Sequence, residues 1–142
     1  MAFAVVPYEH DEKGAAFAAR ATGFTLARTI KTLVVDLGGK SFGLALMPGD
    51  RKLSFKKLSR ALGVKKAIMA DAQTAERLTG YHVGGISPFG IRQHLAVAME
   101  ESLLVHDQVL INGGQRGIML QMAPGDIAAG LNCRLDDLLA EE

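Results

Sequence analysis

The strongest candidates for chemistry in this 142-residue chain are one lysine and one glycine-rich segment. Lys31 begins a strongly apolar run within TIKTLVV, where an ammonium group must either point to solvent or bind an anion. The segment GYHVGGISPFG, residues 80–90, contains four glycines and no carboxylate. Glycine lets backbone N–H groups approach a ligand without a Cβ in the way. The segment is therefore either a connector or a site whose working groups belong to the backbone.

Other kinds of active site have little support in the sequence. Ser87 precedes a proline and does not lie in a GxSxG turn, which argues against a serine hydrolase. No segment matches the GxGxxG or GxxxxGK[ST] nucleotide-binding patterns. The histidines lack the paired spacing of a metal site: they are His10, His82, His94 and His106. We therefore expect no metal and no cofactor.

Composition and charge narrow the class of protein. Hydrophobic residues make up 49% and charged residues 22%, which is typical of a soluble globular protein, and the length suits one domain, residues 1–142. No apolar run approaches the roughly 20 residues of a membrane-spanning helix. The start of the chain lacks the features of a signal peptide. The single cysteine, Cys133, fits a reducing cytoplasm and is expected to be a small buried side chain.

The charged residues are unevenly distributed along the chain. Residues 28–66 contain ten Lys or Arg against two Asp, whereas residues 100–142 contain eight acidic residues against two Arg. This asymmetry suits a protein with one face toward a polyanion. A solvated helix face is the alternative.

The elements that must position these residues follow from periodicity and turn signals. Strands are expected at residues 2–8, 66–70, 94–99, 107–112 and 118–122, and a hairpin over 31–47 turning at Gly38 and Gly39. Small, helix-favouring residues predict a helix at 15–21, and helices are also expected after Asp71 and around Pro124. This order predicts an α+β domain with an antiparallel or mixed sheet, or a closed barrel.

The segment SFKKLSRALG, residues 54–63, predicts an amphipathic helix. Ser54 is expected to cap its start and Gly63 to end it. The outward face would carry Lys56, Lys57 and Arg60.

Four motifs together resemble the YbaK/prolyl-tRNA-synthetase-associated editing domain family. They are YEHD at residues 8–11, IKTLVV at 30–35, LTGYHVGGISPFG at 78–90 and INGGQRG at 111–117. Members of this family hydrolyse mischarged aminoacyl-tRNA, above all the products of prolyl-tRNA synthetase. The resemblance implies a small barrel-like mixed sheet with surrounding helices and a free-standing deacylase acting on Cys- or Ala-tRNA(Pro). The implied partners are the acceptor end of aminoacyl-tRNA and a prolyl-tRNA synthetase.

The resemblance also implies roles for individual residues. Lys31 would hold the ribose or phosphate of the terminal adenosine, and the backbone of Gly84 and Gly85 would meet the ester. Separately, the excess of basic residues between 28 and 66 predicts that the basic helix contacts the tRNA through Lys56, Lys57 and Arg60. The amino-acid pocket would be formed by Tyr8, Phe17, Ile30, Ile86, Ser87, Pro88, Asn112, Gly113 and Arg116.

An aminoacyl ester is already activated, so its hydrolysis needs positioned water and a stabilised oxyanion more than a protein nucleophile. The glycine-rich segment could supply that stabilisation from its backbone. Asn112 stands where family members commonly have serine, and Met119 where some Cys-tRNA deacylases have an acid, so the amino acid removed stays open. Two alternatives also stay open: a non-catalytic module that binds aminoacyl-tRNA or a synthetase, and a general phosphate-ligand binding domain.

Overall fold

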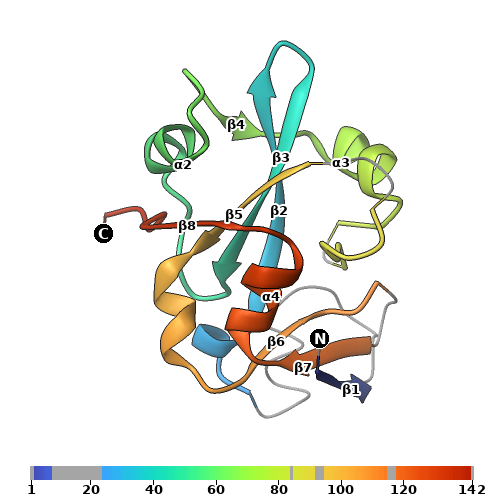
Figure 1. The fold of residues 1–142 in the computed structure, drawn as a ribbon. Helices are drawn as coiled ribbons and strands as arrows, with labels where there is room; N and C mark the ends of the chain where they lie inside the picture. The colour runs from blue at the N-terminus through green and yellow to red at the C-terminus, as the bar shows by residue number, and fades with distance from the viewer. Residues whose placement is uncertain (1, 8–23, 84, 92–94, 115–117, 142) are drawn as a thin grey trace.

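The computed structural model describes residues 2–7, 24–83, 85–91, 95–114 and 118–141. Within these residues the strands form two sheets (Figure 1). One is antiparallel with the order β1-β7-β6, formed by β1 (Phe3–Pro7), β7 (Ile118–Met122) and β6 (Val109–Asn112). The other has the order β4-β2-β3-β5-β8, formed by β4 (Ile68–Met69), β2 (Ile30–Gly38), β3 (Ser41–Pro48), β5 (Ala96–Glu100) and β8 (Arg134–Asp136).

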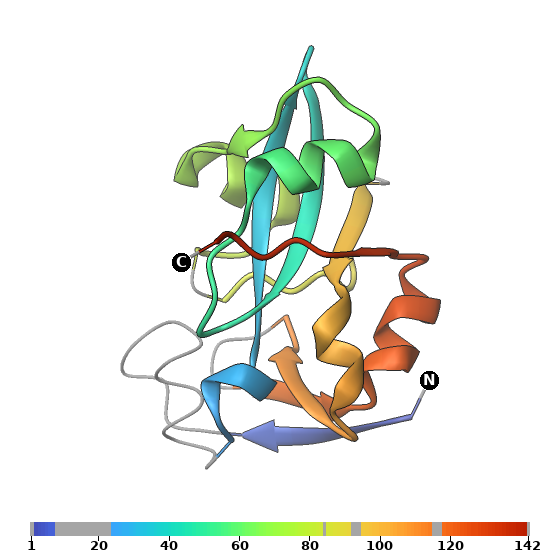
Figure 2. The same cartoon turned by 90° about the vertical axis from the view of Figure 1, so that its left-hand side faces the viewer.

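The second sheet is mixed, which confirms the predicted α+β class. β2 pairs antiparallel with β3 and β4, whereas β5 runs parallel to both β3 and β8. An isolated parallel bridge between Thr29 and Leu110 joins the start of β2 to β6. Residues of both sheets, among them Leu46 and Ile111, belong to one hydrophobic cluster. The three-stranded sheet lies below the five-stranded one in Figure 2.

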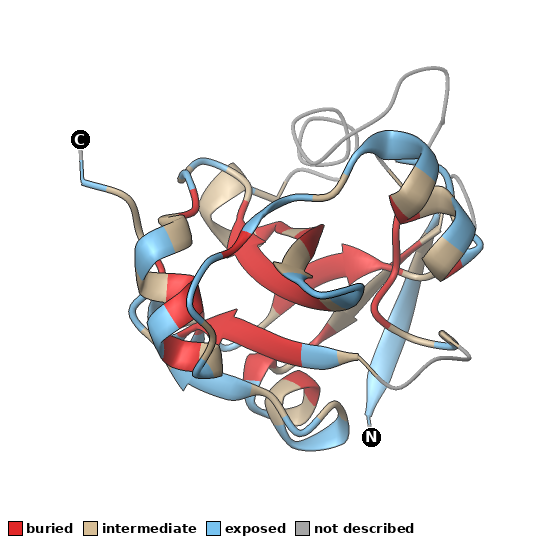
Figure 3. Cartoon of the chain, turned by 90° about the horizontal axis from the view of Figure 1, so that it is seen from above, coloured by how far each residue is buried: buried red, intermediate tan, exposed pale blue. Residues whose placement is uncertain are grey.

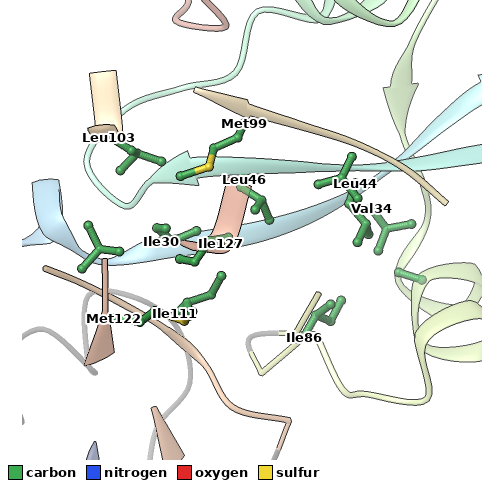
Figure 4. Packing of buried hydrophobic residues seen from close by; sticks show 13 residues of the cluster. Ile30, Val34, Leu44, Leu46, Ile86, Met99, Leu103, Ile111, Met122 and Ile127 are labelled. Atoms are coloured by element: carbon green, nitrogen blue, oxygen red, sulfur yellow. The ribbon is translucent and has the colours of Figure 1, made fainter. Parts of the chain in front are cut away.

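Hydrophobic residues pack on both faces of the central strands β2, β3 and β5, whose alternate residues belong to two different clusters. On one face, Ile30, Leu46 and Met99 pack with Ile111 and Ile86 from outside the sheet (Figure 4). On the other face, Val35 and Met47 pack against Leu58 of α2 (Phe55–Leu62). Seen from above in Figure 3, buried residues concentrate on the strands and exposed residues on the surrounding segments.

The predicted helix boundaries are confirmed by their capping groups. The Ser54 hydroxyl accepts a hydrogen bond from Lys57 N–H at 3.2 Å at the start of α2. The Asp71 carboxylate accepts one from Thr74 N–H at 2.7 Å at the start of α3 (Ala72–Thr79). Each helix ends at a glycine with positive φ, as the C-cap rule requires. The last predicted helix is also present, as α4 (Pro124–Gly130).

Three short elements were not predicted, namely β8 and the 3-10 helices η1 (Leu26–Arg28) and η2 (Glu101–Val105). β8 contains only three residues and is held by parallel pairing with β5, a contact that sequence periodicity does not reveal. The buried Glu100 carboxylate accepts hydrogen bonds from Ser102 N–H in η2 and from Leu138 N–H just after β8. These bonds fix η2 and the C-terminal segment in place. The helix predicted at residues 15–21 lies outside the described residues.

Candidate active site

A pocket of about 440 Å³ lies along the edge of β2. Five consecutive residues, 30–34, line it. Because successive side chains of a strand point to opposite faces, a pocket lined by all five follows the edge of the strand rather than one face. The remaining wall comes from α3 and its flanking segments, and from the turn after β3 and the end of β6: Gly49, Met69, Ala70, Ala72, Ala75, Val83, Ile86 and Asn112.

The edge of β2 is open at this point because β4 pairs only with Val35 and Asp36. Gly49 N–H donates to Thr29 C=O on the β3 side, whereas Ala70 N–H donates to Val34 C=O on the opposite side. Backbone polar groups alternate in direction along an antiparallel strand, so the N–H and C=O of Thr32 point the same way as the C=O of Val34. Among the described residues no strand pairs with Thr32 on that side, and its backbone groups face the pocket.

Lys31 lines this pocket and is half-buried. Burial lowers the pKa of its ammonium group; the charge of Asp50 partly opposes this shift and the charge of Lys52 adds to it. A partly desolvated cation is stabilised by any anion that enters. The geometry therefore favours an anionic ligand beside Lys31.

Thr32 adds a second polar group to the same wall. Its side chain is buried, and its hydroxyl has no hydrogen-bond partner among the described residues. An unpaired buried hydroxyl costs roughly 1–3 kcal/mol, which a bound ligand with a polar atom could offset. Thr32 lies between Ile30 and Val34 on the strand face that packs toward Ile86 (Figure 4).

The glycine-rich segment is held in place by its own hydrogen bonds. Gly85 N–H donates to His82 C=O at 2.9 Å, and Phe89 N–H donates to the Ser87 hydroxyl at 3.1 Å. The Glu76 carboxylate on α3 accepts a hydrogen bond from Val83 N–H at 2.9 Å. These bonds hold Ile86 against the core, where it is buried and lines the pocket.

A family model described as an aminoacyl-tRNA editing domain matches residues 9–129. The chain belongs to this aminoacyl-tRNA editing domain family. The match covers the open edge of β2, the glycine-rich segment and the end of β6.

Relatives and solved structures of this editing domain agree with the assignment. A protein of Enterococcus faecalis, provisionally named a Cys-tRNA(Pro)/Cys-tRNA(Cys) deacylase, is 30% identical over 95% of this chain and 82% of its own length. A proline–tRNA ligase of Trichlorobacter lovleyi is 33% identical over 63% of this chain but only 16% of its own length. A structure provisionally described as a trans-editing enzyme for prolyl tRNA synthetase has a TM-score of 0.88 and 27% identity, covering 98% of this chain and 87% of the other.

The pocket of the editing domain brings together several residues that the sequence singled out. Four of them line it: Ile30, Lys31, Ile86 and Asn112. Four other predicted residues do not line the pocket, although each lies within two residues of Ile86 or Asn112 in the sequence: Gly85, Ser87, Pro88 and Gly113. The remaining predicted site residues, Tyr8, Phe17, Gly84 and Arg116, lie outside the described residues.

The predicted tRNA-binding helix is separated from the pocket by the five-stranded sheet. α2 packs on the face formed by Val35 and Met47, whereas residues 80–83 and 85–90 lie beyond the opposite face (Figures 1 and 2). Lys56 and Arg60 are exposed, and Lys57 is half-buried. A tRNA that contacts α2 and also fills the pocket would have to pass around the edge of the sheet.

Sequence reasoning missed several pocket residues. Thr32 could have been found, because period two places it on the same strand face as Ile30 and Val34. Met69 and Val83 line the mouth of the pocket and are exposed apolar residues, but nothing in their local sequence marks them. Only the packing of distant segments brings them together.

Two further predictions concern Cys133 and metals. Cys133 was expected to be buried, but it is only half-buried at the margin of the core. Desolvation raises the pKa of its thiol to about 11, so it is protonated near neutral pH and is a poor nucleophile. Within the described part of the chain, no group of three or more His, Cys, Asp or Glu side chains could hold a metal ion. No helix of the described residues is long and apolar enough to span a bilayer.

Proposed function

We propose that this editing domain hydrolyses the ester bond of mischarged aminoacyl-tRNA, releasing the free amino acid and the uncharged tRNA. The single observation that carries the proposal is one pocket that joins Lys31, the open edge at Thr32 and the glycine-rich segment at Ile86. Lys31 and a strand edge with backbone polar groups line the same mainly apolar cavity, which suits a substrate with an anionic phosphate near an ester.

In the proposed reaction, water attacks the ester carbonyl and the bond to the terminal ribose oxygen breaks. The ribose oxygen takes one proton of the attacking water, and the amino acid leaves as its carboxylate with release of the other proton to solvent. Lys31 holds the terminal ribose-phosphate, and the backbone of the glycine-rich segment stabilises the oxyanion. Gly84 is the proposed N–H donor, because the Gly85 N–H already donates to His82 C=O. This arrangement needs no protein nucleophile, because positioning and electrostatic stabilisation suffice for an activated ester.

The substrate is proposed to carry a small amino acid, of the Cys-tRNA(Pro) or Ala-tRNA(Pro) type. Three alanines, Ala70, Ala72 and Ala75, line the pocket together with bulkier Ile30 and Ile86. Selection at a second site works by excluding side chains that do not fit, since binding to a synthetase pocket separates near-isosteres by only about 1–3 kcal/mol.

The domain is proposed to act in trans as a free-standing unit in the cytoplasm, on the acceptor end of tRNA. The Enterococcus faecalis relative is matched over most of its own length, which supports a free-standing protein. The proline–tRNA ligase of Trichlorobacter lovleyi contains a segment similar to this domain within a much longer chain. This similarity supports a functional connection to prolyl-tRNA synthetase. The exposed Lys56 and Arg60 of α2, with Lys57, are the proposed tRNA contacts.

The test is a deacylation panel. Purified protein is incubated with Cys-, Ala-, Ser- and Pro-charged tRNA(Pro), with charged tRNA(Cys) and tRNA(Ala) as controls, and release of the amino acid is followed. Hydrolysis of small mischarged amino acids and sparing of Pro-tRNA(Pro) is the expected result. Tight binding without hydrolysis of any substrate would instead identify a non-catalytic module. Equal binding of free nucleotides would identify a general phosphate-ligand domain.

A further inference from the structure

Tyr81 is fixed by hydrogen bonds to Phe89 in its own loop and to Thr79 at the end of α3. Its hydroxyl donates to Phe89 C=O at 2.7 Å, and its N–H donates to the Thr79 hydroxyl at 3.1 Å. The first bond closes the segment that carries Gly85 and Ile86. The shape of this segment therefore depends on the position of one aromatic ring.

The same ring also contacts a second loop. A Cβ built on Gly114 would lie 3.0 Å from the Tyr81 hydroxyl oxygen and 3.3 Å from its Cε1. A Cβ on Gly90 would lie 3.2 Å from the hydroxyl oxygen. Both glycines have positive φ, so these positions favour glycine for conformation as well as for space. Tyr81 thus lies between the glycine-rich segment and the turn that joins β6 to β7.

Each of these two loops carries or directly follows a residue that lines the pocket. Ile86 belongs to the segment that Tyr81 closes, and Asn112 comes two residues before Gly114 at the end of β6. The loops belong to different layers, since one follows α3 and the other connects two strands of the antiparallel sheet (Figure 1). The Tyr81 side chain therefore bonds to Phe89 in one loop and packs closely on Gly114 in the other.

We propose that Tyr81 is a positioning residue that sets the separation of Ile86 and Asn112, and with it the size of the amino acid that the pocket accepts. The proposal rests on the deacylase function proposed above. A pocket that selects by exclusion depends on rigid walls, and a shift of about 1 Å in such a wall can change rates about 100-fold. Tyr81 does not touch the reacting atoms, and it acts through the two loops it holds.

The test compares Tyr81→Phe with the wild-type protein. This variant keeps the ring and removes only the hydroxyl that bonds to Phe89. We expect kcat for the best small substrate to fall about fivefold to tenfold, the size of one lost hydrogen bond. We also expect Leu- and Met-charged forms of the same tRNA, poor substrates of the wild type, to be hydrolysed faster relative to the small one.

Ser59→Ala is the matched control. The Ser59 hydroxyl is buried and donates to Lys56 C=O at 2.9 Å, so its removal deletes the same kind of bond on the opposite face of the sheet. If Tyr81 has only a structural role, both variants will lower the unfolding midpoint and neither will change selectivity. Unchanged selectivity in Tyr81→Phe, or an equal change in Ser59→Ala, overturns the proposal.

Hydrogen exchange separates this proposal from the function on which it rests. Loss of the Tyr81 hydroxyl should accelerate amide exchange at Gly85 and Ile86 and also at Gly113 and Gly114, which follow β6. Unchanged exchange at Gly113 and Gly114 refutes the coupling whatever the activity. A wild-type protein that hydrolyses no charged tRNA refutes the deacylase function and the size selection, while the exchange result still decides whether Tyr81 couples the loops.

Discussion

Lys57 Nζ lies 2.8 Å from a carboxylate oxygen of Asp137 and so ties α2 to the C-terminal segment. This hydrogen bond is the main reason that the pKa of Asp137 is lowered, with further help from Leu139 N–H. Lys57 is therefore engaged within the protein, whereas Lys56 and Arg60 on the same helix are exposed. The predicted tRNA contacts of α2 should fall mainly on those two residues.

We expect the double variant Lys56→Gln with Arg60→Gln to bind tRNA more weakly and with a lower salt dependence. Each lost phosphate contact should reduce the slope of log K against log salt by about 1, because fewer counterions are released. The measurement is a binding titration at several salt concentrations. Lys40→Gln with Arg134→Gln removes the same charge from exposed positions outside α2 and serves as the control. Equal salt slopes in the two double variants would show that α2 does not contact the tRNA.

Lys31→Ala should fold normally and bind tRNA nearly as well as the wild type, yet lose about 100-fold in single-turnover deacylation. The reason is loss of the half-buried cation that positions the terminal ribose-phosphate. Lys31→Arg should recover little, since a guanidinium differs in shape from an ammonium. Lys52→Ala removes a neighbouring exposed lysine and should have a small effect. A folded Lys31→Ala protein with the wild-type rate would refute the role of Lys31.

Gly85→Ala tests whether the glycine-rich segment is a site or a connector. A Cβ at Gly85 would lie 3.6 Å from His82 C=O, an ordinary van der Waals contact, so the variant should fold with an unchanged unfolding midpoint. Deacylation should nevertheless fall about tenfold or more, because the new methyl obstructs the approach of the ester to backbone N–H groups. Gly125→Ala, where a Cβ meets nothing within 4 Å, is the matched control. Activity equal to this control would make the segment a connector.

Thr32→Val should leave the protein as stable as the wild type or stabilise it by about 1 kcal/mol, because it removes a buried hydroxyl that lacks a partner. Thr29→Val should instead destabilise it by about 1 kcal/mol, since the Thr29 hydroxyl donates to Thr25 C=O at 2.9 Å. Urea unfolding of both variants measures the difference. If the Thr32 hydroxyl also contacts the substrate, KM rises in Thr32→Val. A loss of stability as large as that of Thr29→Val would show that the Thr32 hydroxyl has a partner.

The sequence by itself determined the local elements and the family. Ser54 and Gly63 mark the ends of α2, and Gly38 with Gly39 mark the turn between β2 and β3, because capping and turn preferences act over a few neighbouring residues. The spaced motifs around Lys31, Ile86 and Asn112 indicated the editing domain without any knowledge of their contacts.

Only the tertiary structure decided how these parts form a site. The pocket lies along β2 because β4 is too short to pair with Thr32, and Met69 and Val83 reach its mouth from other segments. The contact of Tyr81 with Gly114 and the place of α2 beyond the sheet likewise depend on packing between residues far apart in the chain. Periodicity reports which face of an element is buried, but it does not report which distant element covers that face.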